Sequence, residues 1–309
     1  MAETLPAAVV EAIRAALGRR ARLAEPLARH TSYRIGGPAE LLVLPESVDE
    51  LAAVLRAAAA HGARVTLLGG GSNVLVGDGG IAGIVVKLGR GFGRVEWSAA
   101  DGGERVRAGA SVQLGRLARA AVARGLAGLE FAEGIPGTVG GALFMNAGAY
   151  GGDVAPIVEE IEGLGRDGAA VRLDATAVDF GYRRAHLPAG FVVTAAGFRL
   201  RHDDAARVRA RMAEARARRL AAQPHGQPSG GSVFKNPAGD HAGRLIEAAG
   251  LKGTRAGRAR ISDRHANFIV NEGGARAADV KALMDVAQRV VWERSGVWLE
   301  PELRLVGTW

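Results

Sequence analysis

Apolar positions recur along the chain with two spacings, which predict a mixture of helices and strands. A spacing of three to four residues predicts amphipathic helices, and short apolar runs predict strands. Ser47 and Glu50 add a capping-box pattern at the start of one helix. The predicted helices cover residues 5–22, 47–62, 111–125, 203–222, 242–249 and 277–294. The predicted strands cover residues 40–44, 65–68, 81–88, 105–108, 191–200, 258–261, 267–271 and 297–306, with a hairpin turning at 166–168.

Three glycine-rich segments interrupt this pattern. The first follows a predicted strand as Gly-Gly-Gly-Ser-Asn at 69–73, the second covers 134–148, and the third opens the stretch 230–237. Glycines let a backbone approach a ligand closely, and consecutive N–H groups can hold phosphate oxygens. Clusters of structural turns are the alternative interpretation. Because neither a Walker loop nor a helix-opening Gly-x-Gly-x-x-Gly is present, the segments do not predict a P-loop or a Rossmann fold.

Composition narrows the possible functions. The 309 residues predict about two domains, and the absence of Cys excludes disulfides and thiolate chemistry. The seven His are scattered without metal-ligand spacing, so no metal site is expected. The net charge of +8 is spread along the chain and aromatic residues make up only 5%. These values favour anionic small ligands or a compositional bias over nucleic acid. With no long apolar run, a cytoplasmic protein without a membrane partner is expected.

The stretch 230–237 contains the densest candidate chemistry. Ser232, Lys235 and Asn236 present a hydroxyl, a cation and an amide within five residues, and an acidic pair, Glu300 and Glu302, lies near the C-terminus. Ser232 lacks the Gly-x-Ser-x-Gly context of serine hydrolases. The pattern favours an enzyme that holds phosphorylated ligands and performs proton chemistry, with a cofactor for the harder step.

Arginine supplies the remaining candidates. Arg183 follows Phe-Gly-Tyr at residues 180–182, and the predicted helix over 203–222 carries six arginines. Most of these belong to a solvated face. Arg218 or Arg219, which lie closest in sequence to the stretch 230–237, could bind a phosphate.

In their order along the chain, these segments resemble the UDP-N-acetylenolpyruvoylglucosamine reductases, flavoenzymes of bacterial peptidoglycan synthesis. The Gly-Ser-Val-Phe-Lys-Asn-Pro block at 231–237 is the most diagnostic. With no additional tyrosine-bearing loop, the chain is similar to the compact second type of this family. The resemblance extends over the blocks 31–39, 69–75, 133–148, 181–183, 229–237, 242–253, 262–271 and 299–303.

The resemblance implies an α+β fold with two domains. The first, over 1–200, would be an FAD-binding domain of the vanillyl-alcohol-oxidase (PCMH) type, with lobes at about 1–90 and 91–200. The second, over 201–309, would be a smaller α+β substrate-binding domain, and its last strand at 297–309 would return to the first lobe. FAD would bind non-covalently, and a monomer is expected.

The resemblance also implies a reaction. NADPH would reduce FAD and leave, and the enolpyruvyl ether of UDP-N-acetylglucosamine would take its place. Flavin N5 would then give a hydride to C3 of the enolpyruvyl group, and Ser232 would protonate C2. Arg183 and Glu302 would stabilise the enolate-like charge, with Glu300 as the alternative acid. The implied substrate contacts are Tyr182, Lys235 and Asn236. The implied cofactor contacts are Tyr33, Arg34, Gly69, Gly70, Gly71, Ser72, Asn73, Gly134, Pro136, Gly137, Thr138, Gly140, Gly141, Asn146 and Gly148.

Two departures from the family pattern and two competing functions stay open. Ala185 stands where the family commonly has Ser, so a supporting hydrogen bond is in doubt, and His30 replaces a frequent Asn. The first competing function is an FAD-dependent oxidase of a small alcohol or sugar that uses oxygen. The second is a non-catalytic module that binds nucleotides or nucleic acid through its basic charge.

Overall fold

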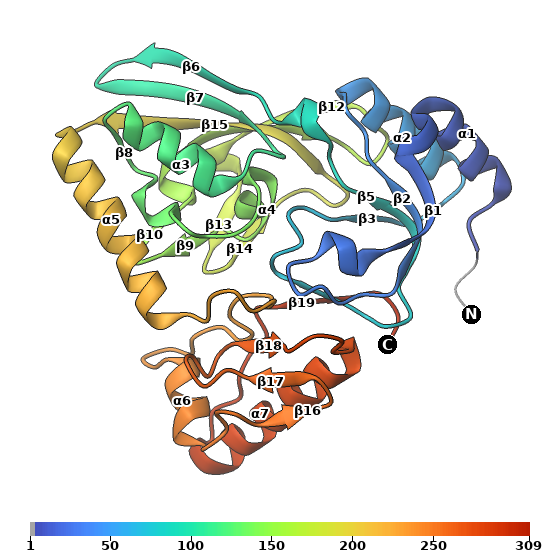
Figure 1. Ribbon diagram of the computed structural model, residues 1–309. Coiled ribbons are helices and arrows are strands. Elements are labelled where there is room, and N and C mark those ends of the chain that lie inside the picture. Colours follow the sequence, from blue (N-terminus) through green and yellow to red (C-terminus); the bar gives the residue numbers. More distant parts are fainter. Residues whose placement is uncertain (1–3) are drawn as a thin grey trace. The chain divides into compact units, whose positions relative to one another are not determined.

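The computed structural model describes residues 4–309, which divide into two compact units (Figure 1). Among the described residues, unit 1 consists of 4–23, Leu41–Gly70 and Gly83–Arg219, and unit 2 consists of Ala24–Glu40, Gly71–Ala82 and Leu220–Trp309. Both units therefore contain segments that are distant in the sequence. These units interleave along the chain and so do not test a single boundary at residue 200, which stays a prediction.

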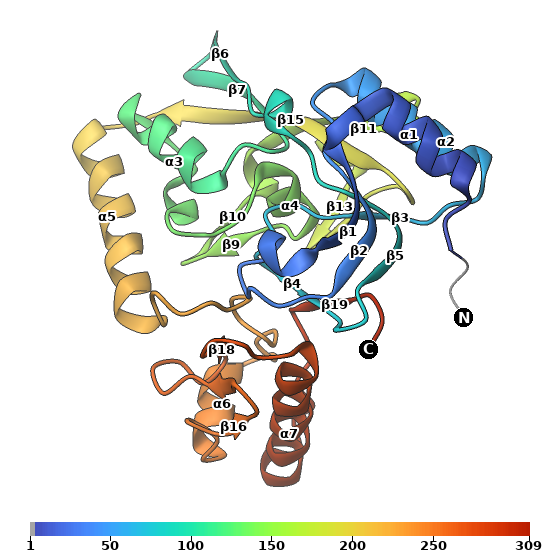
Figure 2. The ribbon, with the colours of Figure 1, turned by 45° about the vertical axis from the view of Figure 1, so that its right-hand side comes forward.

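Unit 1 contains a six-stranded antiparallel sheet. Its order is β12 (Ala170–Asp174), β11 (Val158–Leu164), β15 (Val192–His202), β7 (Gly103–Gly109) and β6 (Val95–Ala100), and β8 (Leu126–Ala127) also pairs with β15. Helices α3 (Leu114–Ala123) and α4 (Val139–Phe144) pack their apolar residues against one face (Figure 2). On β7, Val106 and Ala108 are buried, whereas Arg105 and Arg107 are exposed. The sheet thus has one core face and one solvated face, as is common for antiparallel sheets.

The N-terminal helices form a second core in unit 1. Helices α1 (Ala7–Leu17) and α2 (Val48–Ala60) bury Val9, Ile13, Leu51 and Leu55 together. The sheet beside them has the order β1 (Ala21–Pro26), β2 (Pro38–Val43), β5 (Ile81–Val86) and β3 (Val65–Leu67). The helix predicted over 5–22 is too long, because Gly18 adopts a φ of 56° and the chain continues into a short 3₁₀ turn and β1.

The second glycine-rich segment contains a short helix that the sequence analysis did not predict. Residues 139–144 form α4, although the helix contains Gly140 and Gly141. A Cβ on Gly140 would lie 3.1 Å from the Cβ of Ala110. Glycine at this position therefore lets the helix approach its neighbour closely, which offsets its low helix propensity.

Unit 2 combines a small sheet with two helices. The antiparallel strands β16 (Arg255–Ala256), β17 (Ala259–Ile261) and β18 (Ile269–Asn271) share a core with α6 (Ala242–Ala248) and α7 (Ala277–Ser295). Strand β19 (Arg304–Val306) pairs in parallel with β4 (Val74–Val76). The strand predicted over 297–306 is thus much too long. Pro301 interrupts it and makes only an isolated bridge with Phe234.

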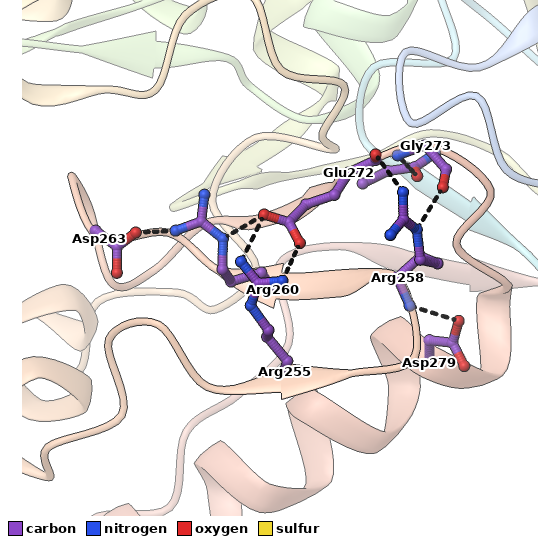
Figure 3. Close-up of polar contacts among 8 residues, drawn as sticks. Arg255, Arg258, Arg260, Asp263, Glu272, Gly273 and Asp279 are labelled. Carbon is purple, nitrogen blue, oxygen red and sulfur yellow. Dashed lines mark hydrogen bonds and ion pairs between the residues drawn. The ribbon is translucent and has the colours of Figure 1, made fainter.

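Polar contacts organise one edge of unit 2 (Figure 3). Glu272 accepts from Nε of Arg260 at 2.7 Å and pairs with Arg255 at 2.9 Å. Asp279 accepts from the backbone N–H of Arg276 at 3.0 Å at the start of α7. Because partly exposed ion pairs contribute only about 0–1 kcal/mol each, this network fixes local geometry more than it stabilises the unit.

The longest helices are α5 (Ala205–Ala222) and α7, and both carry many charged side chains. Asp204 accepts from the backbone N–H of Arg207 at 2.8 Å at the start of α5, so the helix begins two residues after the start predicted at residue 203. Across residues 4–309, no helix combines the length and apolarity that crossing a membrane requires.

The predicted cap of α2 is formed and gives a stability prediction. The Ser47 hydroxyl accepts from the backbone N–H of Glu50 at 3.2 Å. Ser47→Ala should lower the free energy of unfolding by about 1 kcal/mol, because an N-terminal donor loses its partner. Urea denaturation measures this change. Ser98→Ala, on an exposed strand position, is the control and should shift stability by less than about 0.5 kcal/mol. Equal effects of the two substitutions would contradict the capping role.

Candidate active site

The first two glycine-rich segments meet backbone to backbone in unit 1. A Cβ on Gly70 would lie 2.8 Å from Cα of Gly137, and one on Gly69 would lie 3.3 Å from Oγ1 of Thr138. A side chain at residue 70 would therefore force the segments apart. Gly137 itself has a φ of 115°, which L-residues rarely adopt. The structure thus brings together two groups of predicted cofactor contacts that lie about 65 residues apart in the sequence.

The second segment has a packed part and an open part. The backbone N–H groups of Val139 and Gly140 donate to the carbonyls of Val112 and Ala110, so both are used within the unit. A Cβ on Gly141 would meet nothing closer than Oγ1 of Thr138 at 3.8 Å. Protein packing therefore explains Gly140 but does not explain Gly141. Glycine at 141 fits a ligand that lies close to the backbone, as a bound FAD would.

The first segment continues into unit 2, where Gly71 and Asn73 organise neighbouring backbone. The carbonyl of Gly71 accepts from the backbone N–H of Ser32 at 2.9 Å, and a Cβ on Gly71 would lie 2.1 Å from the carbonyl oxygen of His30. The amide of Asn73 donates to the carbonyl of Glu302 at 3.1 Å. Asn73 thus fixes the backbone of the predicted acid, a role that the sequence did not indicate.

Arg183 lies at the tip of a two-residue hairpin turn. Strand β13 (Asp179–Gly181) pairs with β14 (Arg184–His186), which leaves Tyr182 and Arg183 as the turn. Arg183 has a φ of 58°, a conformation that favours Gly or Asn. Its guanidinium lies 4.9 Å from the centroid of the Tyr182 ring. Strain of this kind at a charged residue is typical of functional positions.

Asn146 connects the glycine-rich segment to this hairpin. Its Nδ2 donates to the carbonyl of Gly181 at 3.1 Å, and its Oδ1 accepts from the backbone N–H of Ala155 at 3.0 Å. Asn146 is buried, and its backbone has a φ of 38°. Ala185 is buried on β14 within the same core. Ala185, which replaces the serine common in the family, therefore makes an apolar contact, and the β13–β14 turn still forms.

The structure distinguishes Arg219 from Arg218. Arg218 is exposed and pairs with Glu214 one turn earlier on α5. Arg219 packs its stem against Gly134, where a Cβ would lie 2.7 Å from its Cδ, and its guanidinium lies 5.8 Å from the Tyr150 ring. Burial is the main cause that lowers the pKa of Arg219, and the nearby Arg183 cation adds to it. Two cations on one surface of unit 1 are suited to an anionic ligand.

In unit 2, the segment 230–237, here called the Ser232 loop, runs beside the C-terminal tail. The carbonyl of Val233 accepts from the backbone N–H of Glu302 at 2.8 Å, and the N–H of Lys235 donates to the carbonyl of Glu300 at 2.9 Å. Ser232 and Glu302 therefore lie on neighbouring antiparallel segments, although they are 70 residues apart in the sequence.

The two glycines that open the Ser232 loop have different surroundings. A Cβ on Gly230 would lie 2.4 Å from the Tyr33 ring and 2.6 Å from Leu303, so packing requires this glycine. The interpretation that both glycines make room for a ligand is wrong for Gly230. Gly231 has a φ of 79°, and a Cβ at this position would meet nothing closer than the carbonyl oxygen of Ser72 at 4.0 Å.

Glu300 and Glu302 have different surroundings. Glu300 is exposed and pairs with the Lys235 ammonium at 2.5 Å, whereas Glu302 is half-buried. Residues 299–303, all within the described part of the chain, form no strand. The alternation of side chains along a strand therefore gives no reason to place Glu300 and Glu302 on one face. Lys235, a predicted substrate contact, thus already has an anionic partner.

Three further residues of unit 2, Tyr33, Arg34 and Asn236, were predicted to contact the cofactor or the substrate. The Tyr33 side chain is fully buried beside Gly230, and burial raises the pKa of its hydroxyl. Arg34 is exposed with a φ of 55°. Asn236 accepts from the backbone N–H of Ala242 at 3.1 Å and so helps to begin α6. The ring of His30 bonds to the carboxylate of Glu25 at 3.0 Å.

Comparison with known proteins identifies the family. Residues 223–306 match the C-terminal domain of UDP-N-acetylenolpyruvoylglucosamine reductase, and residues 39–174 match an FAD-binding domain. A UDP-N-acetylenolpyruvoylglucosamine reductase of Rubrobacter xylanophilus is 48% identical over 93% of this chain and 95% of its own length. The chain belongs to the UDP-N-acetylenolpyruvoylglucosamine reductase family.

Other members agree with this assignment. A UDP-N-acetylenolpyruvoylglucosamine reductase of Geobacter metallireducens is 46% identical over 92% of this chain and 93% of its own. The crystal structure of a UDP-N-acetylenolpyruvylglucosamine reductase from Thermus caldophilus has a TM-score of 0.79 and 39% identity, and the similarity covers 93% of this chain and all of that one.

These findings confirm several sequence-based predictions. The chain is an FAD-containing oxidoreductase with an α+β fold, in which a C-terminal domain follows the FAD-binding domain. The resemblance inferred from the motifs is also confirmed. The individual site residues, the monomeric state and the cytoplasmic location stay predictions. The sequence analysis missed Asn267, although it lies within the family block 262–271.

The contact between the glycine-rich segments predicts how FAD is lost. Gly137→Val should yield protein without flavin, because valine is strained at a φ of 115° in a segment that packs against Gly70. The flavin absorbance of the purified protein, relative to its absorbance at 280 nm, measures this loss. Gly62→Val, also at a positive φ but in open space, is the matched control and should retain flavin. Normal flavin content in Gly137→Val would contradict the assignment of this segment to the cofactor.

Proposed function

We propose that this protein is an NADPH-dependent reductase that converts the enolpyruvyl ether of UDP-N-acetylglucosamine to UDP-N-acetylmuramate in peptidoglycan synthesis. Membership of the family over almost the whole chain supports this proposal. The observation that carries the chemistry is the pairing of the Ser232 loop with the segment that contains Glu302. FAD, when bound, supplies at C3 of the enolpyruvyl group the hydride that originates from NADPH.

Ser232 is the proposed proton donor to C2 of the substrate. A hydroxyl is a weak acid, so proton transfer requires accurate placement and a site that stabilises negative charge. The neighbouring residue, Val233, is 1% exposed and hydrogen-bonded to Glu302, which limits how far the hydroxyl can move. This restraint on the neighbouring backbone supports the role proposed for Ser232.

Arg183 and Glu302 are the proposed stabilisers of the charge that develops during reduction. The planar guanidinium of Arg183 suits bidentate binding of the substrate carboxylate. A carboxyl group can stabilise a developing enolate only when it is protonated and donates a hydrogen bond. Glu302 suits this role better than Glu300, whose exposed carboxylate pairs with Lys235.

The diphosphate of the substrate needs cations as well. We assign this role to Arg219 rather than Arg218, because Arg219 lies against Gly134 and near Arg183, whereas Arg218 pairs with Glu214. Tyr182, Lys235 and Asn236 are the further proposed substrate contacts. Tyr182 is 53% exposed, so its ring is accessible to a ligand.

The reductase is distinguished from an oxygen-dependent oxidase by its products. With NADPH and the enolpyruvyl ether, in the absence of oxygen, one UDP-N-acetylmuramate should form for each NADPH consumed. Mass spectrometry of the nucleotide sugar, with NADPH absorbance, measures both quantities. Turnover that requires oxygen and leaves the enolpyruvyl ether unchanged would contradict the proposal.

Ser232→Ala should separate the two half-reactions. Flavin reduction by NADPH should be nearly unchanged, because it needs no proton from Ser232. Substrate reduction should slow by about 10²–10⁴-fold, the usual contribution of a positioned proton donor. Anaerobic stopped-flow absorbance measures each step separately. Near-normal substrate reduction would remove Ser232 from the mechanism.

The two tail glutamates should respond differently to amide substitution. Glu302→Gln should slow substrate reduction strongly and leave flavin reduction intact, because an amide is a weaker hydrogen-bond donor to a developing enolate than a protonated carboxyl group. Glu300→Gln, the matched control, should alter kcat little, because it only removes an exposed ion pair worth about 0–1 kcal/mol. Steady-state kinetics of both variants distinguish these outcomes. The reverse pattern would reassign the acid to Glu300.

A further inference from the structure

The family block 262–271 contacts the Ser232 loop through one buried amide. Asn267 is 3% exposed and lies in the turn between β17 and β18. Its Oδ1 accepts from the backbone N–H of Phe234 at 2.9 Å, and its Nδ2 donates to the carbonyl of the same residue at 2.8 Å. The side chain therefore satisfies both backbone groups of Phe234, as a neighbouring β-strand would.

The backbone of Asn267 extends this contact. Its carbonyl accepts from the N–H of Val233 at 2.9 Å, so three hydrogen bonds join Asn267 to the two residues after Ser232. On the opposite edge, Val233 and Lys235 bond to the tail at Glu302 and Glu300. The Ser232 loop is thus held between Asn267 and the tail.

Asn267 is itself held in place by its turn. Its backbone N–H donates to Nδ1 of His265 at 3.2 Å, and the His265 ring packs edge-on against Phe268 at 5.0 Å. Burial lowers the pKa of His265, with a smaller effect of the Lys252 cation, and this favours the neutral ring that can accept at Nδ1. The hydroxyl of Ser262 accepts from the backbone N–H of Arg264 at 3.2 Å in the same turn.

We propose that Asn267 is a positioning residue that sets the place of the Ser232 hydroxyl for proton delivery. This inference rests on the proposed role of Ser232. Asparagine is suited to the task because its short side chain offers one acceptor and one donor group. Aspartate in its ionised form lacks the donor, and leucine lacks both. A misplacement of about 1 Å can slow a catalysed step by about 10²-fold, so loss of this amide should affect proton delivery selectively.

The test compares Asn267→Asp with Asn267→Leu in the FAD-loaded enzyme. In both variants, flavin reduction by NADPH should stay near the wild-type rate. Substrate reduction should slow by about 10²-fold at neutral pH. Anaerobic stopped-flow absorbance separates the steps, and thermal unfolding reports stability independently. If Asn267→Leu does not fold, the nearly isosteric Asn267→Asp still tests the proposal.

The pH profile provides a readout that a general loss of packing would not change. Burial raises the pKa of a carboxyl group, and the protonated form can donate to the Phe234 carbonyl as the amide does. The rate of substrate reduction by Asn267→Asp, relative to wild type, should therefore recover as the pH falls. Asn267→Leu has no group to protonate and should show no recovery. The absence of any difference between the two profiles would contradict the proposed positioning.

A double-mutant cycle with Ser232→Ala decides between direct and indirect effects. If Asn267 acts through Ser232, then adding Asn267→Asp to Ser232→Ala should slow substrate reduction little further. Asp263→Ala, at an exposed position of the same turn whose side chain pairs with Arg260, is the matched control and should leave substrate reduction near wild type.

The possible outcomes separate this inference from the proposed function. Normal substrate reduction in Asn267→Asp, or effects that multiply fully in the double variant, would overturn positioning by Asn267 while Ser232 keeps its role. Normal substrate reduction in Ser232→Ala would overturn the role of Ser232, and the positioning role would fall with it.

Discussion

The proposed chemistry of unit 2 depends on hydrogen bonds along both edges of residues 233–235. Buried backbone groups must find partners, and here no regular sheet supplies them. The side chain of Asn267 satisfies Phe234 on one edge, and the tail at 300–303 satisfies Val233 and Lys235 on the other. The buried side chains of Val233 and Phe234 anchor the same residues in the core. These contacts restrain the backbone directly after Ser232, the residue proposed to deliver the proton.

Asparagine side chains bond to the backbone next to, or at, several candidate residues. Asn146 bonds to Gly181 before the Arg183 turn, and Asn73 bonds to the carbonyl of Glu302. Each amide fixes backbone rather than a charged side chain. This arrangement is suited to catalysis because a neutral amide orients a segment without altering the charge near the reacting group.

The sequence predicted the motif-bearing segments better than their internal structure. Hydrophobic spacing located most helices, and the ordered motifs identified the family, because both signals are local in the sequence. Spacing failed at 297–306, where Pro301 and the pairing with the Ser232 loop replace a strand, and at α4, where packing against Ala110 makes glycine acceptable in a helix. The sequence also did not show why residue 230 is a glycine, because the contact that requires it is distant along the chain. The Tyr33 ring that requires it lies almost 200 residues earlier.

Candidate residues were found when their chemistry was visible in a motif, as for Ser232 and Arg183. Asn267 was missed because it carries no charge and no nucleophile, and only the fold shows that both halves of its amide bind one residue. The choice between Arg218 and Arg219 likewise required the structure, since adjacent positions on a helix face different surroundings.

The central claim is that the bound flavin accepts electrons from NADPH and loses them to the enolpyruvyl substrate. The most direct measurement is the visible absorbance spectrum of the purified protein, recorded without oxygen. We predict a flavin spectrum that bleaches with NADPH and recovers when the enolpyruvyl ether of UDP-N-acetylglucosamine is added. Recovery only after oxygen is admitted would contradict the account and indicate an oxidase.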